Sequence, residues 1–509
     1  MDIKKKIGQL IVAGFDGFVV NEHIRNLIIY HNVGNIILFE RNCQNPEQVF
    51  KLVQELQKLA VEHNGVPLFV TIDQENGIVN RIYDGVTNFP GNMAQSVGAT
   101  LEESAKIAEY TGIGLKALGV NFNLAPTLDV NNNPKNPVIG NRSFSDSADV
   151  VAERAVYAIR GYEHAGIIAT AKHFPGHGDT DLDSHLALPT VNHDRARLDA
   201  VELLPFKKAI ENGIPALMSA HIVFPALDES GVPATLSKKI LTDLLRAELG
   251  FDGVLMTDCM EMKAIDDLYG TAKSTPLAIK AGADLICLSH SENKQIAAIE
   301  EVKSLLVSDS ELRERIEESY HRVIRLKNEY NITAMLATTY DDAVKQLYQS
   351  EYEQLADRIS KTSIQINDAD GLIPITVKKV LVIAPDGRAL TGADGLRQIP
   401  NFATYLAEQL DDCTAVKITN SPTADEIAEI VGQLDEFELV IIGTHNALFV
   451  AEQEHLVRKI IEKNKQIILI PLRNPHDQEL FPEIKSVVIP YEYTVRSMKT
   501  LAGVLLNGK

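Results

Sequence analysis

Short apolar runs alternate with amphipathic segments along most of this chain. The runs are rich in β-branched residues, and the segments between them, such as 45–62, 101–117 and 148–165, have the apolar spacing of helices. This alternation predicts parallel strands joined by helical crossovers. In the first part of the chain the predicted strands are Leu10–Phe15, Asn35–Phe39, Val66–Ile72, Val120–Leu124, Ile167–His173, Ile214–Met218, Gly253–Thr257 and Ala283–Leu288.

Eight strand–helix units in succession are typical of a (β/α)8 barrel rather than an open sheet. We therefore predict a barrel domain over residues 1–335, followed by a helical linker over 336–372. Residues 373–509 continue with shorter units, which predict a smaller doubly wound α/β domain. Its expected strands are Lys379–Ala384, Ala415–Thr419, Leu439–Gly443, Gln466–Pro471 and Ser486–Ile489.

Composition narrows the classes of partner. The formal net charge of -20 argues against nucleic acid or an anionic membrane surface. No apolar stretch is long enough for a transmembrane helix, and the first residues do not resemble a signal peptide. The 4 cysteines are far apart and form no CxxC pair. Reduced thiols of this kind fit a cytoplasmic protein. We expect no cofactor.

The segment KHFPGHGDTDLDSH, from Lys172 to His185, is a loop that directly follows the apolar run 166–171. Charged and imidazole groups also follow the neighbouring predicted strands. They are Asp73-Gln74-Glu75, then Asn123 with Asp129 and Arg142, then Lys172-His173, then His221, and then Asp258. Such groups after successive strands predict an active site at the carboxyl end of a barrel. For Asp258 the alternative is a helix N-cap.

These residues carry a family resemblance. KHFPGHGDTDLDSH is similar to the fingerprint of the β-N-acetylglucosaminidase branch of glycoside hydrolase family 3. The similarity continues through most of the first 330 residues, and the second domain resembles the αβα sandwich of that family. The matching motifs are IGQLIVAGF, TIDQENGIVNR, NFNLAPTLDV, NPVIGNRSF, PATLS, GVLMTDCMEMKAI and AGADLICLS.

The resemblance implies a retaining glycosidase with a covalent intermediate. Asp258 matches the nucleophile that attacks the anomeric carbon. His185, held by Asp183, matches an acid/base pair that replaces the usual second carboxylic acid. The residues that match the family's sugar clamp are Asp73, Arg81, Arg142, Lys172 and His173.

One strand-end motif departs from the family pattern. Where the family often has DQEGGRVQR, this chain has DQENGIVNR, so Asn76 and Ile78 replace a glycine and an arginine. Asp73 and Arg81 keep their spacing, and the clamp is expected to persist.

Several nearby residues have two interpretations. His173 and His177 could bond loop backbone rather than substrate, and we expect this for His177. Asp179 and Asp181 are expected to be turn residues. Glu261 could support the loop after the seventh strand, but we expect a solvated acid at a helix start.

The resemblance therefore implies an exo-β-N-acetylglucosaminidase that acts on N-acetylglucosamine-containing glycosides. Peptidoglycan (muropeptide) fragments and chitin-derived fragments end in the same sugar, and the aglycone stays open. A phosphorylase that uses the same residues is the alternative function. A metal-dependent barrel hydrolase is disfavoured, because His173, His177 and His185 lack the helical spacing of metal ligands. A non-catalytic sugar-binding protein would be expected to lack Asp258, Asp183 or His185.

The second domain shows no phosphate-binding loop, because APDGRALTGADG lacks GxGxxG. In much of the wider family a C-terminal domain lends an acidic acid/base residue to the barrel. Here the resemblance implies that the loop ending at His185 supplies that function, so the second domain need not reach the site. We expect it to be structural or to serve oligomerisation.

Overall fold

The computed structural model describes residues 1–180, 183–184, 187–333, 338–386, 391, 394–395, 399–463 and 465–508. Its first sheet has 8 strands in the order β7-β6-β5-β4-β3-β2-β1-β8, and all of its pairs are parallel. A bridge between Met256 and Leu285 joins β7 to β8, so the sheet closes into the predicted barrel. The strands are β1 (Ile11–Ala13), β2 (Asn35–Leu38), β3 (Phe69–Ile72), β4 (Phe122–Asn123), β5 (Ile168–Phe174), β6 (Ala216–Ser219), β7 (Val254–Thr257) and β8 (Ile286–Leu288).

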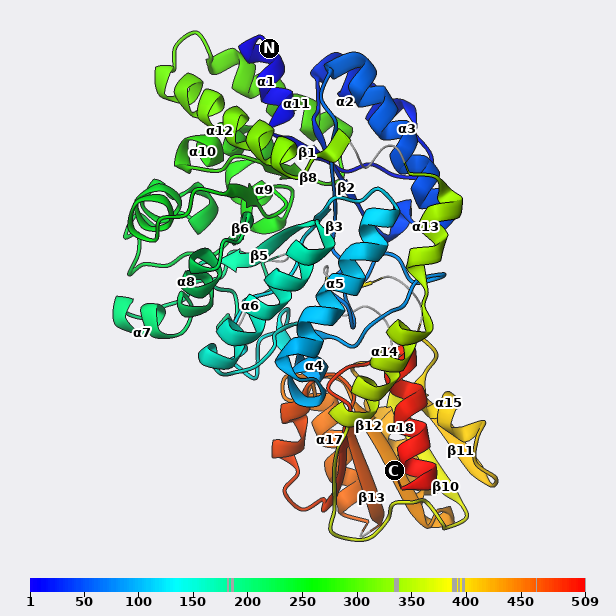
Figure 1. Ribbon diagram of the computed structural model, residues 1–509. Coiled ribbons are helices and arrows are strands. Elements are labelled where there is room, and N and C mark those ends of the chain that lie inside the picture. The colour runs from blue at the N-terminus through cyan, green and yellow to red at the C-terminus, as the bar shows by residue number, and fades with distance from the viewer. Residues whose placement is uncertain are drawn as a thin grey trace.

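Helices surround this barrel (Figure 1). They are α1 (Ile3–Gln9), α2 (Glu22–His31), α3 (Pro46–Asn64), α4 (Asn92–Gly98), α5 (Leu101–Ala117), α6 (Ala148–Ala165), α7 (Arg195–Ala200), α8 (Leu204–Glu211), a π-helix (Lys239–Glu248), α9 (Lys263–Tyr269), α10 (Thr271–Ala281), α11 (Glu292–Leu305) and α12 (Ser310–Glu329). Their starts follow local capping chemistry. The Asn45 side chain accepts from the Gln48 N–H before α3, and Thr100 with Glu103 forms a capping box before α5.

The barrel strands are buried along their whole length, because helices cover the outside and side chains fill the inside. Phe69 and Phe122 pack edge to face inside this core, with ring centroids 5.2 Å apart. The burial of β5 extends to its carboxyl end, where Lys172 and His173 are 1% and 6% exposed. A buried ammonium at this point requires charged partners, and these define the site described below.

The second sheet has 6 strands in the order β11-β10-β12-β13-β14-β9. The five predicted strands are present as β10 (Val380–Pro385), β11 (Cys413–Ile418), β12 (Leu439–Thr444), β13 (Gln466–Pro471) and β14 (Ser486–Ile489). A sixth strand, β9 (Gln365–Asp368), was not predicted from the sequence and pairs antiparallel with β14 at the sheet edge. Its residues are mostly exposed, so it has no apolar run. The helices of this domain are α15 (Phe402–Ala407), α16 (Ala424–Gln433), α17 (Ala451–Ile461) and α18 (Val495–Asn507).

Two further helices, α13 (Tyr340–Leu347) and α14 (Ser350–Ser363), lie in the segment between the two sheets. Helix α14 runs beside α18 and near α4, so it joins the two lobes (Figure 1). Arg496 of α18 forms an ion pair of 2.7 Å with Glu353 of α14. Glu492 accepts a hydrogen bond of 2.7 Å from the Gly91 N–H of the barrel. Polar contacts of this kind hold the second domain against the barrel.

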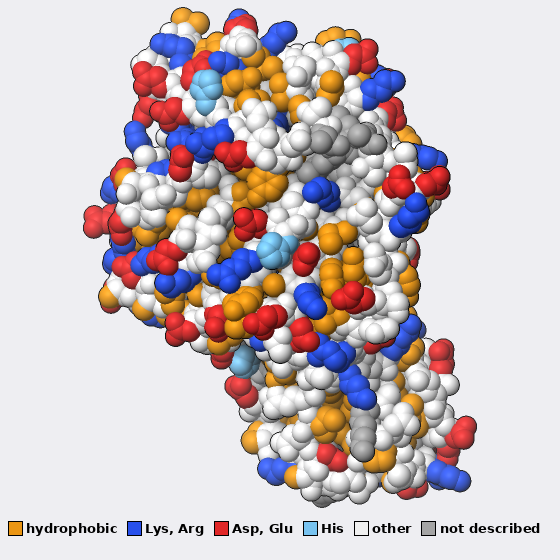
Figure 2. Space-filling view, viewed as in Figure 1, with side chains coloured by type: hydrophobic (Ala, Val, Ile, Leu, Met, Phe, Trp, Pro, Cys, Tyr) orange, Lys and Arg blue, Asp and Glu red, His pale blue; other side chains and the backbone are white. Residues whose placement is uncertain are grey.

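The outer surface is of mixed charge. Figure 2 shows a larger and a smaller lobe, with acidic and basic side chains interspersed over the visible face. Within the described ranges, no helix combines the length and the apolarity needed to cross a bilayer.

Candidate active site

A cavity of about 260 Å³ opens at the carboxyl ends of the barrel strands. The predicted residues that line it come from four places in the fold: Asp73 and Arg81 after β3, Arg142 after β4, Lys172 and His173 at the end of β5, and Asp258 directly after β7. Strands β3 and β7 are four positions apart in a barrel of 8 strands, so Asp258 faces the β3 residues from the opposite side.

On the β3 side, charged side chains form one cluster. Lys172 Nζ lies 2.7 Å from Asp73 Oδ1 and 2.7 Å from Glu75 Oε1. Arg142 holds Glu75 in a bidentate pair, with Nε–Oε2 of 3.0 Å and Nη2–Oε1 of 2.8 Å. Arg81 Nη2 lies 3.5 Å from Asp73 Oδ2. Three cations and two carboxylates therefore fix one another in a nearly dry site, which preorganises charged donors and acceptors at the cavity.

The charges in this cluster hold each other ionised. Burial by itself would raise the pKa of Glu75, but Arg142 and Lys172 lower it well below its usual range. Burial would likewise lower the pKa of Lys172, whereas Asp73 and Glu75 raise it above its usual value. Glu75 is thus as central to the cluster as Asp73. Glu75 was expected at the strand end but was not among the predicted clamp residues.

Asn76 occupies the place of the family's glycine and has a φ of 74°. Asparagine is among the few residues that adopt this left-handed conformation readily, so the loop keeps the glycine backbone. Its amide nitrogen donates to Thr111 Oγ1 over 3.2 Å. The loop therefore tolerates the substitution, and Asp73 and Arg81 keep the contact of 3.5 Å described above.

Asp129, fully buried, organises the chain at the end of β5 and just after it, from His173 to His177. Its Oδ1 accepts from the backbone N–H of His173 over 3.1 Å and of His177 over 2.7 Å. Its Oδ2 lies 2.7 Å from His173 Nδ1, which sets the orientation of that ring against the cavity. Burial would raise the pKa of Asp129, but His173 lowers it, so this carboxylate stays ionised. Asp129 was expected beyond a strand end, but this function was not predicted from the sequence.

The contacts of His177 favour its structural interpretation. Its Nδ1 lies 3.0 Å from Thr180 Oγ1 and its Nε2 lies 2.8 Å from Ser184 Oγ, so both ring nitrogens bond the loop itself. Burial lowers the pKa of His177 to about 4, and the ring is neutral at pH 7. The loop backbone also packs tightly here, because a Cβ at Gly178 would lie 1.7 Å from the Val130 carbonyl oxygen.

Asp258 lies in a turn rather than at a helix start. Its N–H donates to the Ser219 carbonyl over 3.2 Å, and its Oδ1 accepts from the Cys259 N–H over 2.7 Å. The next helix, α9, begins at Lys263 with Met262 as its N-cap residue, so the N-cap alternative is wrong. His221, after β6, supports this turn, since its Nε2 lies 3.0 Å from the Cys259 carbonyl oxygen.

The predicted acid/base pair is placed only in part. Asp183 is 8% exposed, and its carbonyl accepts from the Ala187 N–H over 3.1 Å. Its neighbour Ser184 lines the cavity. His185 and Asp181 lie outside the described residues, so the Asp183–His185 pair stays a prediction.

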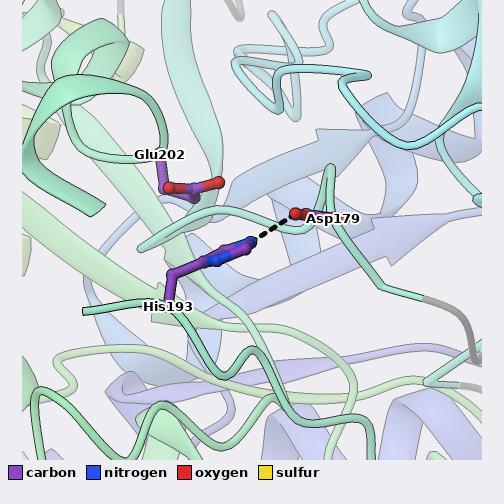
Figure 3. A group of neighbouring side chains, drawn as sticks. All are labelled: Asp179, His193 and Glu202. Carbon is purple, nitrogen blue, oxygen red and sulfur yellow. Dashed lines mark hydrogen bonds and ion pairs between the residues drawn. The ribbon is translucent and has the colours of Figure 1, made fainter. Parts of the chain in front are cut away.

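Asp179, expected to be a turn residue, helps to anchor the loop (Figure 3). Its Oδ2 lies 2.5 Å from His193 Nε2, beyond the end of the loop. Glu202 lies beside them and accepts from Arg197 Nη1 over 3.0 and 2.8 Å. The ligand-type atoms of Asp179, His193 and Glu202 fall within 4.8 Å of one another, as in some metal sites. All three already have hydrogen-bonding or ionic partners, which fits an anchoring function.

The expectation for Glu261 is wrong. Its carboxylate accepts from the backbone N–H of His290 over 2.8 Å and of Ser291 over 3.1 Å, just before α11. These N–H groups need acceptors at a helix start, and the turn after β7 carries Glu261 to them. The side chain therefore links the β7 and β8 loops.

The second domain also reaches the cavity, although the sequence did not require it to do so. Asp394, in the segment after β10, lines it together with the barrel residues. Arg473, after β13, holds the Asp394 carboxylate with two bonds of 2.9 Å. No local motif marks Asp394, because its position depends on how the two domains pack.

Comparison with known proteins identifies the family. Residues 2–326 match the glycosyl hydrolase family 3 N terminal domain. The chain is 33% identical to "Beta-hexosaminidase A" of Pseudoalteromonas piscicida, over 94% of this chain and 87% of that protein. The solved family 3 β-N-acetylglucosaminidase of Paenibacillus sp. str. FPU-7 is 40% identical with a TM-score of 0.90, over 99% of this chain and 97% of that one.

A fungal multi-domain family 3 β-N-acetylglucosaminidase is 33% identical with a TM-score of 0.88, over 100% of this chain and 60% of that one. The family match covers more than half of the chain, and the barrel, the charged cavity and the second α/β domain agree with it. The protein is a glycoside hydrolase and belongs to glycosyl hydrolase family 3.

Proposed function

We propose that this enzyme is a retaining exo-β-N-acetylglucosaminidase. It removes terminal β-linked N-acetylglucosamine through a covalent glycosyl-enzyme. The names of its relatives, "Beta-hexosaminidase A" and a β-N-acetylglucosaminidase, support the sugar specificity.

The observation that carries the proposal is the cavity itself. Asp258 lies on its β7 side, across from the cluster of Asp73, Arg81 and Lys172. A sugar whose hydroxyls bind the charged cluster would turn its anomeric carbon toward Asp258. The volume of about 260 Å³ is below the roughly 300–1,000 Å³ typical of ligand pockets, which fits one sugar ring and exo action.

In the first step the Asp258 carboxylate attacks the anomeric carbon as the bond to the leaving oxygen breaks. His185 gives its proton to that oxygen, and the sugar becomes an ester of Asp258. Asp183 acts through His185: its negative charge favours the protonated imidazole and fixes the tautomer.

In the second step His185 takes a proton from water, which attacks the anomeric carbon and releases Asp258. Two inversions give net retention of the β configuration. As positive charge develops on the ring, its hydroxyls become better donors, so a hydrogen bond to the preoriented Asp73 carboxylate strengthens.

We further propose that the natural substrates are muropeptide fragments or chitin-derived oligosaccharides, and that the enzyme works in the cytoplasm. Its cysteines, Cys43, Cys259, Cys287 and Cys413, are free thiols, which supports a reducing compartment.

The test is hydrolysis of 4-nitrophenyl N-acetyl-β-glucosaminide with NMR detection of the first-formed anomer. The expected product is the β anomer. Release of the α anomer, or no turnover by the folded enzyme, would contradict the proposal. A parallel panel of muropeptides and chitobiose then assigns the aglycone by the ratio of kcat/KM values.

A further inference from the structure

The carboxyl edge of the second sheet faces the active-site cavity of the barrel. In a doubly wound sheet, ligands bind outside the carboxyl ends of the strands, where the strand order reverses. Here that point lies between β10 and β12, which lead away to opposite sides of the sheet. Asp394 follows β10, His445 follows β12 and Arg473 follows β13, so all three lie at this edge. Asp394 also lines the barrel cavity.

Gly395, which follows Asp394 directly, lies against the β3 loop. The Gly395 N–H donates to the Ile78 carbonyl over 3.2 Å. A Cβ at Gly395 would lie 1.8 Å from the Tyr83 hydroxyl oxygen, so a larger residue here would require the Tyr83 side chain to move. The docking places Asp394 on the β3 side of the cavity, away from Asp258 on the β7 side.

Arg473 fixes the orientation of the Asp394 carboxylate. Its Nη1 donates to Oδ2 and its Nη2 to Oδ1, each over 2.9 Å, and Asp394 is 6% exposed. The Thr391 N–H adds a bond of 3.0 Å to Oδ2. A bidentate arginine pair of this kind restricts the plane of the carboxylate. Behind it, His445 packs edge to face on Tyr493 at a ring-centroid distance of 4.9 Å.

We propose that Asp394 is a substrate-binding residue that the second domain supplies to the barrel, and that Arg473 positions it. The Asp394 carboxylate accepts a hydrogen bond from a hydroxyl at the non-reducing end of the bound N-acetylglucosamine, the end away from Asp258. The second domain thereby closes the cavity beyond the terminal sugar and contributes to exo specificity. This inference rests on the proposed function, because Asp258 as nucleophile sets the direction of the sugar.

Two expected results distinguish a substrate-binding function of Asp394 from an acid/base function. A site built to bond a hydroxyl rejects the analogue that lacks it, and a bond to a charged group is worth roughly 10- to 100-fold in kcat/KM. An acid/base residue would instead make the loss depend on the leaving group. If Asp394 is a binding residue on the β3 side, the loss of kcat/KM does not depend on the leaving group.

The experiment compares aryl N-acetyl-β-glucosaminides with their 3-deoxy, 4-deoxy and 6-deoxy analogues. We expect the wild-type enzyme to prefer the parent by roughly 10- to 100-fold over at least one analogue. In Asp394→Ala that preference should fall to near unity for one hydroxyl only, with the other ratios unchanged. Arg473→Met should lower the same ratio, and Arg473→Lys should restore part of it. The Asp394→Ala variant should lose the same factor in kcat/KM on aryl glycosides whose leaving groups differ in pKa.

The matched control is Asp425→Asn, an exposed carboxylate at the start of α16 in the same domain, which should keep all wild-type ratios. Circular dichroism checks that the Asp394→Ala variant is folded. If it is not folded, Asp394→Asn, which keeps the size of the side chain, replaces it in the comparison. If the wild type does not cleave the parent glycoside, the proposed function fails. If it does, but the Asp394 and Arg473 variants keep every deoxy ratio, only the present inference is overturned.

Discussion

Lys172 and Glu75 form an ion pair of 2.7 Å in which both side chains are 2% exposed. Glu75 connects Lys172 to Arg142, so two of the predicted clamp residues are held by a carboxylate outside the predicted set. Burial of such a pair is costly unless every charge is compensated, and here each member has an opposite partner. The cluster is therefore expected to respond as a unit to substitution.

Replacing Glu75 with Gln removes a charge that Lys172 and Arg142 share. The two cations would then repel each other in a buried site, and the clamp would lose its alignment with the sugar. We expect kcat/KM to fall by roughly 100-fold or more, with KM raised and kcat lowered. The measurement is steady-state kinetics on the aryl glycoside.

The matched control for that variant is Glu47→Gln, which breaks an exposed pair with Lys51. A surface pair of this kind contributes little, so kinetics and melting temperature should stay at wild-type values. Wild-type kinetics in Glu75→Gln would show that the cluster does not orient the substrate.

Replacing Asp258 with Asn should remove the nucleophile and leave sugar binding largely intact. Loss of one catalytic group typically lowers kcat by several orders of magnitude. Single-turnover kinetics and the affinity for N-acetylglucosamine check the two halves of this prediction. Asp243→Asn, an exposed carboxylate of the π-helix, is the control. Turnover near the wild-type level in pure Asp258→Asn enzyme would disprove the assignment.

Replacing His185 with Ala should harm substrates with poor leaving groups much more than activated aryl glycosides. A nitrophenolate leaves with little proton donation, whereas a sugar alkoxide needs a full proton. Asp183→Ala should show the same pattern more mildly, because it acts through the imidazole. The measurement is the dependence of kcat/KM on leaving-group pKa. Equal losses on both classes would point to another proton donor, with Asp181 the first to test.

Glu492, which lies at the contact between the two domains, should make the free energy of unfolding depend on pH. Burial raises its pKa to about 7 from 4.5, so between these values the folded state holds a proton that the unfolded state has lost. Stability from this group therefore declines as pH rises from 4.5 to about 7, and stays level above that. At about 1.4 kcal/mol per pKa unit the full effect is on the order of 3 kcal/mol.

Glu492→Gln has no such titration. The difference in unfolding free energy, variant minus wild type, should increase between pH 5 and pH 8, measured by denaturant titration at each pH. A difference that is constant over this range would show that Glu492 does not titrate there.

The acceptor chemistry gives a further prediction. An Asp183–His185 pair carries its negative charge on Asp183, away from the atom that faces the acceptor. A carboxylate base would instead repel an incoming anion. We expect hydrolysis as the main reaction, with phosphate tolerated as an acceptor. Product analysis with and without millimolar phosphate tests this by detection of N-acetylglucosamine 1-phosphate. If no N-acetylglucosamine 1-phosphate forms and phosphate does not change the rate, the enzyme catalyses hydrolysis and not phosphorolysis.

The sequence by itself determined the barrel and most of the strands of the second domain. Buried parallel strands are nearly continuous apolar runs, and both 10–15 and 466–471 show this pattern locally. Strand β9 was missed because its residues are mostly exposed and its pairing with β14 is not local. The strand ends also predicted which side chains would share the cavity, since parallel strands bring their carboxyl ends together.

Only the tertiary structure decided how those side chains bond. The sequence places Glu75 and Asp129 after predicted strands, but their importance depends on the partners that burial forces on them, Lys172 and His173. Asp394 depends on the docking of one domain on another, which no local pattern encodes. Propensity and periodicity act over a few residues, whereas ion pairing and domain packing join groups hundreds of residues apart.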